Sequence, residues 1–249
     1  MPPPLTPRAA VFDIEGTLVD CLSLTLESWR ETLQEAGHTV SYRDLQPLFG
    51  MDGLWMLNRL LPKERQDFKQ HLLTAQGERY RREFLRRAQP FPGVRSLFAF
   101  LKQEGVLIGI GTTCQKEEVA VYDERLGILE LTDALTCGES APHGKPDPSL
   151  FEQCLRKLGI EQASHAIAVG DTPYDAIAAK NLGMECAGVL TGGFSQRALR
   201  EAGCDLVLQE VQNVRTLWQK GSGAAARVPQ EVDPLSLPHN GPDGHGDLS

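Results

Sequence analysis

The chain has 249 residues, with 33 acidic and 25 basic side chains and a formal net charge of −8 at pH 7. This length can bury the core of one ordinary domain and a smaller one, but the acidic balance is unfavourable for a general nucleic-acid binder, whose affinity comes from neutralising phosphates. No apolar run approaches the length of a membrane span, and the N-terminus has no apolar secretory region.

The first predicted strand, Ala9 to Phe12, ends in two acidic residues one position apart. Asp13 and Glu15 follow it directly, and Gly16 then turns the chain. In an open α/β sheet, the carboxyl ends of the strands border the crevice where ligands bind. Two carboxylates there can bind a hard cation, act as a nucleophile or move protons. They can also simply cap a turn and face solvent, and this stretch alone leaves both interpretations open.

After residue 20 the spacing of apolar residues becomes helical. From Leu22 to Ala36 they recur three or four positions apart, and Gly37 provides a stop. Ser41 followed by Asp44 is typical of a helix start. Further helices are expected over residues 54–61 and 63–88. Residues 20–89 therefore predict an all-helical insertion whose two crossings into the rest of the chain would act as hinges.

From residue 92 onward, strands and helices alternate. Strands are expected over residues 106–111, 134–136, 166–169, 186–190 and 206–208, and helices over 94–104, 116–126, 148–158, 175–182 and 195–202. Repeated strand and helix units with short connections predict a parallel sheet covered on both faces. Residues 220–249 are rich in Gly, Pro, Ser and Ala and contain no aromatic residue, so we expect a disordered tail there.

Polar residues lie at or between the ends of the later strands. They are Thr112 and Thr113, Lys145 in a G-K-P-D-P segment, and the pair Asp171 and Asp175. Each has a simpler explanation: the acids could cap a helix, the threonines could finish a strand, and the lysine could be a solvated loop charge. Together, in this order and at strand ends, they favour a single catalytic site.

These four motifs resemble the signature of the haloacid dehalogenase superfamily, and specifically its phosphatase branch with a helical cap. The resemblance covers roughly residues 9–218. It implies an α/β fold in which a Rossmann-like parallel sheet, with the first strand central, carries an inserted all-helical cap domain. The implied organisation is a catalytic core over residues 1–19 and 90–219, a helical cap over 20–89, and the tail over 220–249.

One position departs from the usual pattern of the superfamily. Most of its phosphatases carry Asp two residues after the nucleophile, whereas this chain has Glu15. A glutamate at this position resembles the first motif of the enolase-phosphatases. It argues against a dehalogenase or phosphonate-hydrolase activity, because those enzymes have non-acidic residues at this position. A second departure is the pair Thr113 and Cys114, where Asn or Ser is commoner.

The resemblance also implies a role for each motif. Asp13 would attack phosphorus to form an aspartyl-phosphate, and Glu15 would protonate the departing alcohol and later accept a proton from water. Lys145 would offset the charge of the phosphate. Mg²⁺ would be held by Asp13, the main-chain carbonyl of Glu15 and Asp171, with Asp175 as a further acid of the metal site. The phosphate would contact Thr112, Thr113, Gly16 and Lys145.

The sequence therefore predicts a Mg²⁺-dependent phosphatase that acts on a small phosphorylated metabolite. The alternatives are a phosphosugar mutase of the β-phosphoglucomutase type and a non-catalytic protein that binds phosphate or a metabolite on the same fold. The cap usually sets specificity in this superfamily, and Asn58 and Arg59 are the candidates for substrate contact there. Six widely spaced cysteines without a C-x-x-C pair favour reduced thiols. We expect a cytoplasmic monomer or homodimer with no nucleic-acid and no membrane partner.

Overall fold

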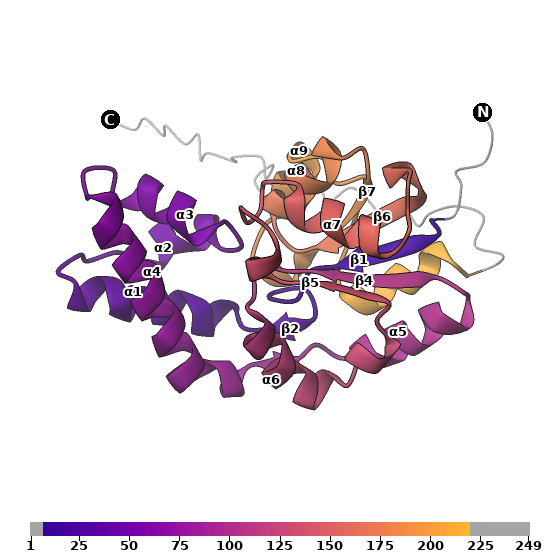
Figure 1. The fold of residues 1–249 in the computed structure, drawn as a ribbon, viewed down its shortest axis with the longest axis horizontal. Coiled ribbons are helices and arrows are strands. Elements are labelled where there is room, and N and C mark those ends of the chain that lie inside the picture. Colours follow the sequence, from indigo (N-terminus) through magenta and orange to yellow (C-terminus); the bar gives the residue numbers. More distant parts are fainter. Residues whose placement is uncertain (1–6, 220–249) are drawn as a thin grey trace, which may run out of the picture. The chain divides into compact units, whose positions relative to one another are not determined.

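The computed structural model describes residues 7–219, so the predicted tail over residues 220–249 lies outside the described residues. Six parallel strands form a sheet in the order β5-β4-β1-β6-β7-β8 (Figure 1). The strands are β1 (Ala9–Phe12), β4 (Leu107–Gly111), β5 (Ala134–Thr136), β6 (Ala166–Gly170), β7 (Glu185–Val189) and β8 (Leu206–Leu208). The first strand lies between β4 and β6, which confirms its expected central position.

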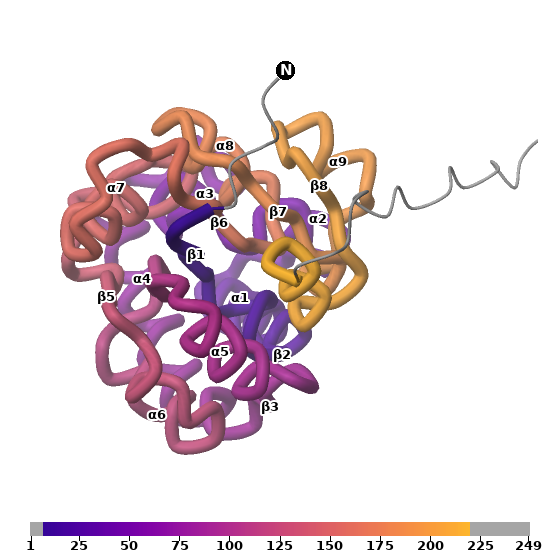
Figure 2. The backbone as a smooth tube through the Cα atoms, turned by 90° about the vertical axis from the view of Figure 1, so that its right-hand side faces the viewer, coloured from indigo at the N-terminus to yellow at the C-terminus, as the bar shows by residue number. Residues whose placement is uncertain are grey.

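Successive side chains of β1 point to opposite faces of the sheet, and all four are buried. Ala9 and Val11 belong to the apolar cluster that contains Phe151, whereas Ala10 and Phe12 belong to the one that contains Phe98. In Figure 2, α7 and α8 lie on one side of β1 and α5 and α6 on the other. A continuous apolar run is what a strand buried on both faces requires.

The helices of this alternating part lie close to their expected positions. They are α5 (Val94–Gln103), α6 (Lys116–Leu126), α7 (Ser149–Lys157), α8 (Pro173–Asn181) and α9 (Gln196–Glu201), with a 3₁₀ segment, η8 (Val211–Leu217), near the end. Helix α8 begins two residues before the predicted start, because Thr172 caps it and Pro173 is suited to the first helical position. Within residues 7–219, no helix is both long enough and apolar enough to cross a membrane.

Residues between β1 and β4 form the expected helical insertion. Its helices are α1 (Leu22–Glu35), α2 (Tyr42–Leu45), α3 (Gly53–Leu60) and α4 (Gln66–Arg79), followed by a π-helical turn, η2 (Tyr80–Phe84), and a 3₁₀ turn, η3 (Leu85–Arg87). The capping box expected at Ser41 and Asp44 is present. The single helix expected over residues 63–88 is instead divided, because the hydrogen-bond pattern changes at Tyr80.

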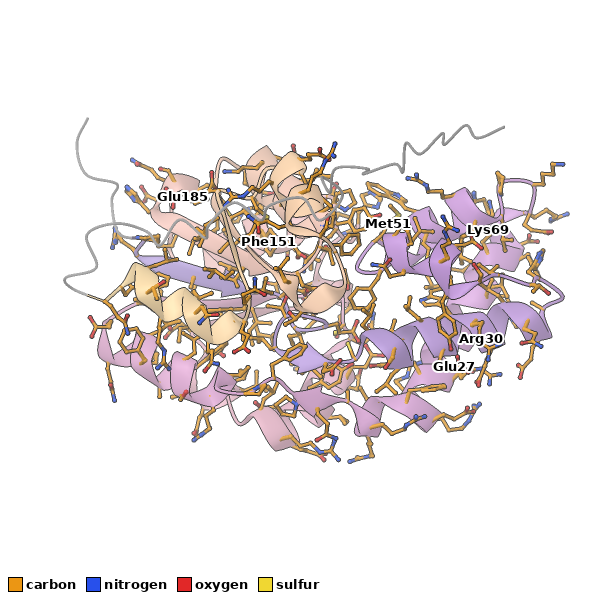
Figure 3. All side chains as sticks on the ribbon, turned by 180° about the vertical axis from the view of Figure 1, so that it is seen from behind. Glu27, Arg30, Met51, Lys69, Phe151 and Glu185 are labelled. Atoms are coloured by element: carbon orange, nitrogen blue, oxygen red, sulfur yellow. The ribbon has the colours of Figure 1, made fainter. Side chains whose placement is uncertain are left out.

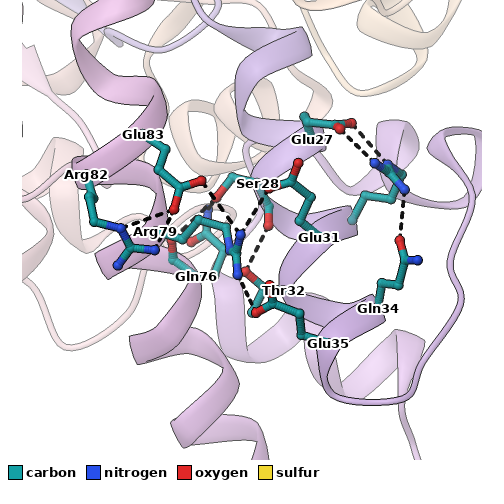
Figure 4. Close-up of polar contacts among 11 residues, drawn as sticks. Glu27, Ser28, Glu31, Thr32, Gln34, Glu35, Gln76, Arg79, Arg82 and Glu83 are labelled. Atoms are coloured by element: carbon teal, nitrogen blue, oxygen red, sulfur yellow. Dashed lines mark hydrogen bonds and ion pairs between the residues drawn. The ribbon is translucent and has the colours of Figure 1, made fainter.

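Most arginines of the insertion pair with acids, and Arg79 is the most extensively paired of them. Figure 4 shows Arg79 between acids of α1 and η2, where its guanidinium pairs with Glu31 (3.1 Å), Glu35 and Glu83 (3.7 Å). Two of these partners, Glu31 and Glu35, connect the end of α4 to α1, and Glu83 lies in the following turn η2. Because the Arg79 side chain is mostly shielded from solvent, these pairs are screened less than ordinary surface ion pairs.

The two crossings between the insertion and the sheet are paired with each other. Strand β2 (Val19–Asp20) runs antiparallel to β3 (Gln89–Pro90), with Val19 opposite Pro90 and Asp20 opposite Gln89. The chain therefore leaves and re-enters the sheet region at one place. We propose this two-stranded ribbon as the boundary of the cap, because the predicted insertion over residues 20–89 begins in one of its strands and ends in the other.

Candidate active site

The acidic residues expected to form the site come from neighbouring strands. Asp13 follows β1 and Asp171 follows β6, and these strands are paired in parallel with Phe12 opposite Val169. Their carboxyl ends therefore meet at one edge of the sheet. Asp175, in the first turn of α8, joins them, and the three residues each offer a carboxylate oxygen within 4.8 Å of the others. All three are buried.

Lys145 supplies the positive charge among these acids. Its Nζ lies 2.6 Å from Asp13 Oδ1 and 2.7 Å from Asp175 Oδ1, and the side chain is buried. The ammonium also lies 5.2 Å from the ring centre of Phe151 on α7, which Figure 3 labels. Burial acts to lower the pKa of Lys145, but the two carboxylates outweigh it and raise the pKa above its ordinary value. The ammonium is therefore charged at neutral pH.

Asp52, which the sequence analysis did not single out, holds the loop that carries Lys145. The Asp52 N–H donates to the Lys145 carbonyl (2.9 Å), and Asp52 Oδ2 accepts the N–H of Gly144 (3.1 Å). The other carboxylate oxygen caps α3 by accepting two main-chain N–H groups. The pattern of an acid before Gly53 predicts only the cap, because the contact with residue 144 depends on the fold.

The carboxylate of Asp171 is enclosed by small residues. Thr17 donates its hydroxyl to Asp171 Oδ1 (2.5 Å), whereas Oδ2 is buried and accepts no hydrogen bond within residues 7–219. A Cβ at Gly16 or Gly192 would overlap with this second oxygen. Gly16 also has a φ of +82°, so a larger residue there would be strained as well as crowded. Both glycines keep one side of Oδ2 open.

The donor set fits a divalent cation. Three carboxylates and one ammonium leave two negative charges uncompensated in a buried place. Burial first, and then the neighbouring Asp175 and Asp13, raise the pKa of Asp171 well above its usual range. Burial likewise raises the pKa of Asp13 to about 6, although Lys145 opposes it. A hard cation bound by oxygen ligands would remove this repulsion.

The two carboxylate oxygens of Asp175 make different contacts, one with the start of α8 and one with Lys145. Its Oδ2 accepts the hydroxyl of Thr172 (2.7 Å) and the Thr172 N–H (3.1 Å), which completes a capping box at the start of α8. Its Oδ1 pairs with Lys145. The helix-cap explanation therefore applies, and the same carboxylate also pairs with the Lys145 ammonium from the start of α8.

Thr112 and Thr113 follow β4 at the same edge of the sheet. The main-chain N–H of Thr112 donates to the Thr136 carbonyl (3.1 Å), and its Oγ1 accepts the N–H of Cys114 (3.2 Å). Since Oγ1 accepts that bond, its own proton is left to donate. Thr113 lies beside a cleft of about 730 Å³ formed with the helical insertion.

Glu15 lines the same cleft. Its Oε1 accepts a hydrogen bond from the hydroxyl of Tyr122 (2.7 Å), a residue of α6 that the sequence analysis did not identify. Burial first, and then the charges of Glu118 and Asp13, raise the pKa of Glu15 to about 7, although Tyr122 opposes this. A carboxyl with this pKa can give and take a proton near neutral pH.

Comparison with known proteins identifies the family to which this arrangement belongs. A family model described as haloacid dehalogenase-like hydrolase matches residues 10–189, which is more than half of the chain. The chain belongs to this family. The resemblance inferred from the four motifs is thus confirmed.

Two curated relatives match this haloacid dehalogenase-like hydrolase over most of its length. It is 29% identical over 231 residues to the phosphoglycolate phosphatase of Agrobacterium fabrum, covering 90% of this chain and 98% of that protein. It is 26% identical over 213 residues to the phosphorylated carbohydrates phosphatase of Thermotoga maritima, covering 83% and 97%. The crystal structure of a hydrolase from Pseudomonas syringae superposes with a TM-score of 0.77 at 23% identity, covering 84% and 96%, which shows the shared fold.

Asn58 and Arg59 are the two cap residues predicted from the sequence to contact the substrate of this haloacid dehalogenase-like hydrolase. Neither Asn58 nor Arg59 is among the described residues that line the cleft. Asn58 Oδ1 accepts hydrogen bonds from Lys69 Nζ and Gln66 Nε2, both at 2.9 Å, so its carbonyl serves the packing of α3 against α4. Arg59 is exposed. A role in substrate contact stays a prediction for both residues, without support from the lining of the cleft.

Proposed function

We propose that this protein is a Mg²⁺-dependent phosphomonoesterase that works through an aspartyl-phosphate on Asp13. The observation that carries the proposal is the position of Asp13 at the carboxyl end of the central strand, 2.6 Å from a buried lysine and beside two further buried acids. Phosphoryl transfer asks a protein mainly for placement and charge stabilisation, and these groups supply both.

The metal would be held by Asp13, the main-chain carbonyl of Glu15 and Asp171, with Asp175 close by. The open Oδ2 of Asp171 and the uncompensated negative charge support this assignment. When bound, Mg²⁺ supplies neutralisation of charge on the phosphate and on the acids around it. Asp175 contributes chiefly by orienting Lys145, because its Oδ1 pairs with that ammonium.

The side chains perform two steps. A carboxylate oxygen of Asp13 forms a bond to phosphorus while the ester oxygen leaves, and Glu15 gives its proton to that oxygen. Water then attacks the phosphorus of the aspartyl-phosphate, Glu15 takes the proton of the water, and the Asp13 carboxylate is released. Lys145 and the Thr112 hydroxyl hold phosphate oxygens throughout, with Thr113 beside them. The Thr112 main-chain N–H is not counted among these donors, because it pairs with Thr136.

Glu15→Gln is expected to slow the reaction in a way that depends on the leaving group. The amide cannot give a proton, so alkyl phosphates should lose roughly 10²- to 10⁴-fold in the first step, whereas aryl phosphates with good leaving groups should lose much less. Single-turnover rates with a matched alkyl and aryl pair measure this. Equal losses on both substrates would show that Glu15 is not the acid.

The lining of the cleft favours a substrate whose leaving group carries no negative charge. Four acids, Glu15, Asp52, Glu117 and Glu118, lie among the described lining residues, against Arg81 and His143 as bases. Arg81 is already paired with Glu118 at 3.3 Å. A second anionic group on the substrate would therefore meet the exposed carboxylate of Glu117 and, among the described lining residues, no unpaired guanidinium.

A neutral polyol phosphate such as glycerol 1-phosphate should therefore be a better substrate than phosphoglycolate. We expect at least about a tenfold difference in kcat/KM, since about 1.4 kcal/mol of repulsion is worth a factor of ten. Glu117→Gln removes one exposed charge from the cleft and should reduce the difference in kcat/KM between the two substrates. Glu104→Gln removes an exposed charge outside the cleft and should leave that difference unchanged. Preference for phosphoglycolate would contradict this assignment of the leaving group.

The reaction class is tested by phosphate release from a panel of sugar, polyol, short-acid and nucleotide phosphates, with Mg²⁺ and with EDTA. The proposal expects release from at least one member that EDTA abolishes. An isomerised sugar phosphate without free phosphate would indicate a mutase. Tight binding of substrates without any turnover would indicate a binding protein.

A further inference from the structure

Glu15 is one methylene longer than aspartate, and the structure contains a partner that matches this length. The Tyr122 hydroxyl lies 2.7 Å from Glu15 Oε1 and donates to it. Tyr122 belongs to α6 and is buried, so its ring is held by packing on several sides. Glu15, in contrast, lines the cleft and has three side-chain torsions to fix.

A second tyrosine continues this contact into the helical insertion. The hydroxyls of Tyr80 and Tyr122 lie 2.7 Å apart. Because a phenol has one proton and Tyr122 gives its own to Glu15, Tyr80 donates to Tyr122. The direction is therefore fixed from Tyr80 to Tyr122 to Glu15. Both tyrosines are buried, with 4% of each residue's surface exposed, and Tyr80 also lines the cleft.

Tyr80 stands where the backbone of the insertion changes. It is the first residue of the π-helical turn η2, after the regular helix α4, and its ring stacks on Phe84 with centres 6.4 Å apart. Single π-helical turns are uncommon and are frequent at functional sites. The wider turn occurs at the residue whose hydroxyl reaches α6.

The next residue also reaches α6. Arg81 pairs with Glu118 at 3.3 Å, and Glu118 Oε2 accepts the N–H of Gln115 at the start of that helix (2.8 Å). Farther along, Arg86 pairs with Glu124 at 2.9 Å. The end of the insertion is thus attached along α6, the helix that carries Tyr122.

We propose that Tyr122 is a positioning residue that holds the Glu15 carboxyl in place for proton transfer, and that Tyr80 connects this placement to the helical insertion. The proposal rests on the proposed function for the role of Glu15. A displacement of about 1 Å in a reacting group can cost about 10²-fold in rate, so one hydrogen bond that fixes a long side chain has a measurable effect. An aspartate at position 15 would be too short to use the same hydroxyl.

The test is a double-mutant cycle between Tyr122→Phe and Glu15→Asp. With Glu15 present, Tyr122→Phe should lower kcat for an alkyl phosphate roughly 10- to 100-fold with little change in KM, and leave an activated aryl phosphate nearly unaffected. In the Glu15→Asp background the same change should cost less than about threefold, because the contact is already absent. Tyr80→Phe should give a smaller loss of the same kind.

Tyr42→Phe is the matched control, since Tyr42 is an exposed tyrosine of the insertion and makes no hydroxyl contact with Glu15. Equal losses of kcat from Tyr122→Phe in the two backgrounds, or a change in KM alone, would overturn the proposal.

Crystal structures of the wild type and of Tyr122→Phe test the placement of the Glu15 side chain without any turnover. The proposal expects one Glu15 orientation in the first and several in the second, and an unchanged orientation would overturn it. Absence of wild-type turnover would instead count against the proposed function.

Discussion

Replacing Asp13 by asparagine should abolish phosphate release. The amide is a far weaker nucleophile than the carboxylate, because its nitrogen lone pair is delocalised into the carbonyl and its oxygen carries no full negative charge, and loss of a nucleophile typically costs on the order of 10⁴-fold or more. Lys145 keeps Asp175 as a partner at 2.7 Å, so the buried ammonium is not left alone and the fold should be retained. Steady-state phosphate release together with a cooperative thermal melt measures both parts of this expectation.

Asp67→Asn serves as the control for that variant. Asp67 is an exposed acid of α4 that pairs with Arg65 and takes no part in the site, so its replacement should leave turnover unchanged. Substantial phosphate release by a well-folded Asp13→Asn variant would remove Asp13 from the role of nucleophile.

Asp171→Asn should eliminate the response of the protein to Mg²⁺. In the wild type, a Mg²⁺ concentration about 100-fold above Kd should raise the melting temperature by roughly 5–10 °C. The variant should show no such rise and no turnover, because it replaces the open Oδ2 by an amide. Without metal it should melt higher than the wild type, since one of three buried like charges is gone.

The matched control for this experiment is Asp205→Asn. Like Asp171, Asp205 accepts a hydrogen bond, here from the Cys186 N–H at 2.7 Å, and it pairs with Lys180, but it lies outside the three-acid cluster. Its Mg²⁺ response should equal that of the wild type. A normal melting shift in Asp171→Asn would place the metal elsewhere.

The sheet and the acids at its edge could be predicted from local sequence. The strand from Ala9 to Phe12 is an uninterrupted apolar run, and Asp13 comes where that run ends. Parallel strands bring their carboxyl ends to one edge, so acids after β1 and β6 had to become neighbours once the fold was known. The family resemblance implied only that the first strand is central, and the order of the other strands, which periodicity cannot give, comes from the structure.

Contacts that depend on tertiary placement could not be predicted. Tyr122 lies on the buried face of an amphipathic helix, where an aromatic residue ordinarily signals core packing, and nothing local links it to Glu15. The pairing of Val19 with Pro90 was missed because a strand of two residues has no periodicity. The main-chain N–H of Thr112 is not free to bind a phosphate, because it donates to the Thr136 carbonyl. This contact likewise depends on the register between β4 and β5.

The candidates for substrate contact show the same limit. Arg59 and Asn58 follow a glycine-flanked turn and are polar residues in a cap, but neither is among the described residues that line the cleft, so their role in substrate contact stays a prediction. The acids and the arginine that do line it come from several separate segments. The lining of this cleft therefore depends on how the insertion packs on α6, which no single motif encodes.

The central claim is that a phosphoryl group is carried on Asp13, and trapping it is the most direct measurement. The enzyme is mixed with a labelled aryl phosphate, quenched in acid during the first turnover and mapped by peptide mass spectrometry. We predict label on the peptide that contains Asp13, more of it in Glu15→Gln because water then lacks its base, and none in Asp13→Asn. Rapid phosphate release with no labelled peptide at any time, or label on another residue, would contradict the account.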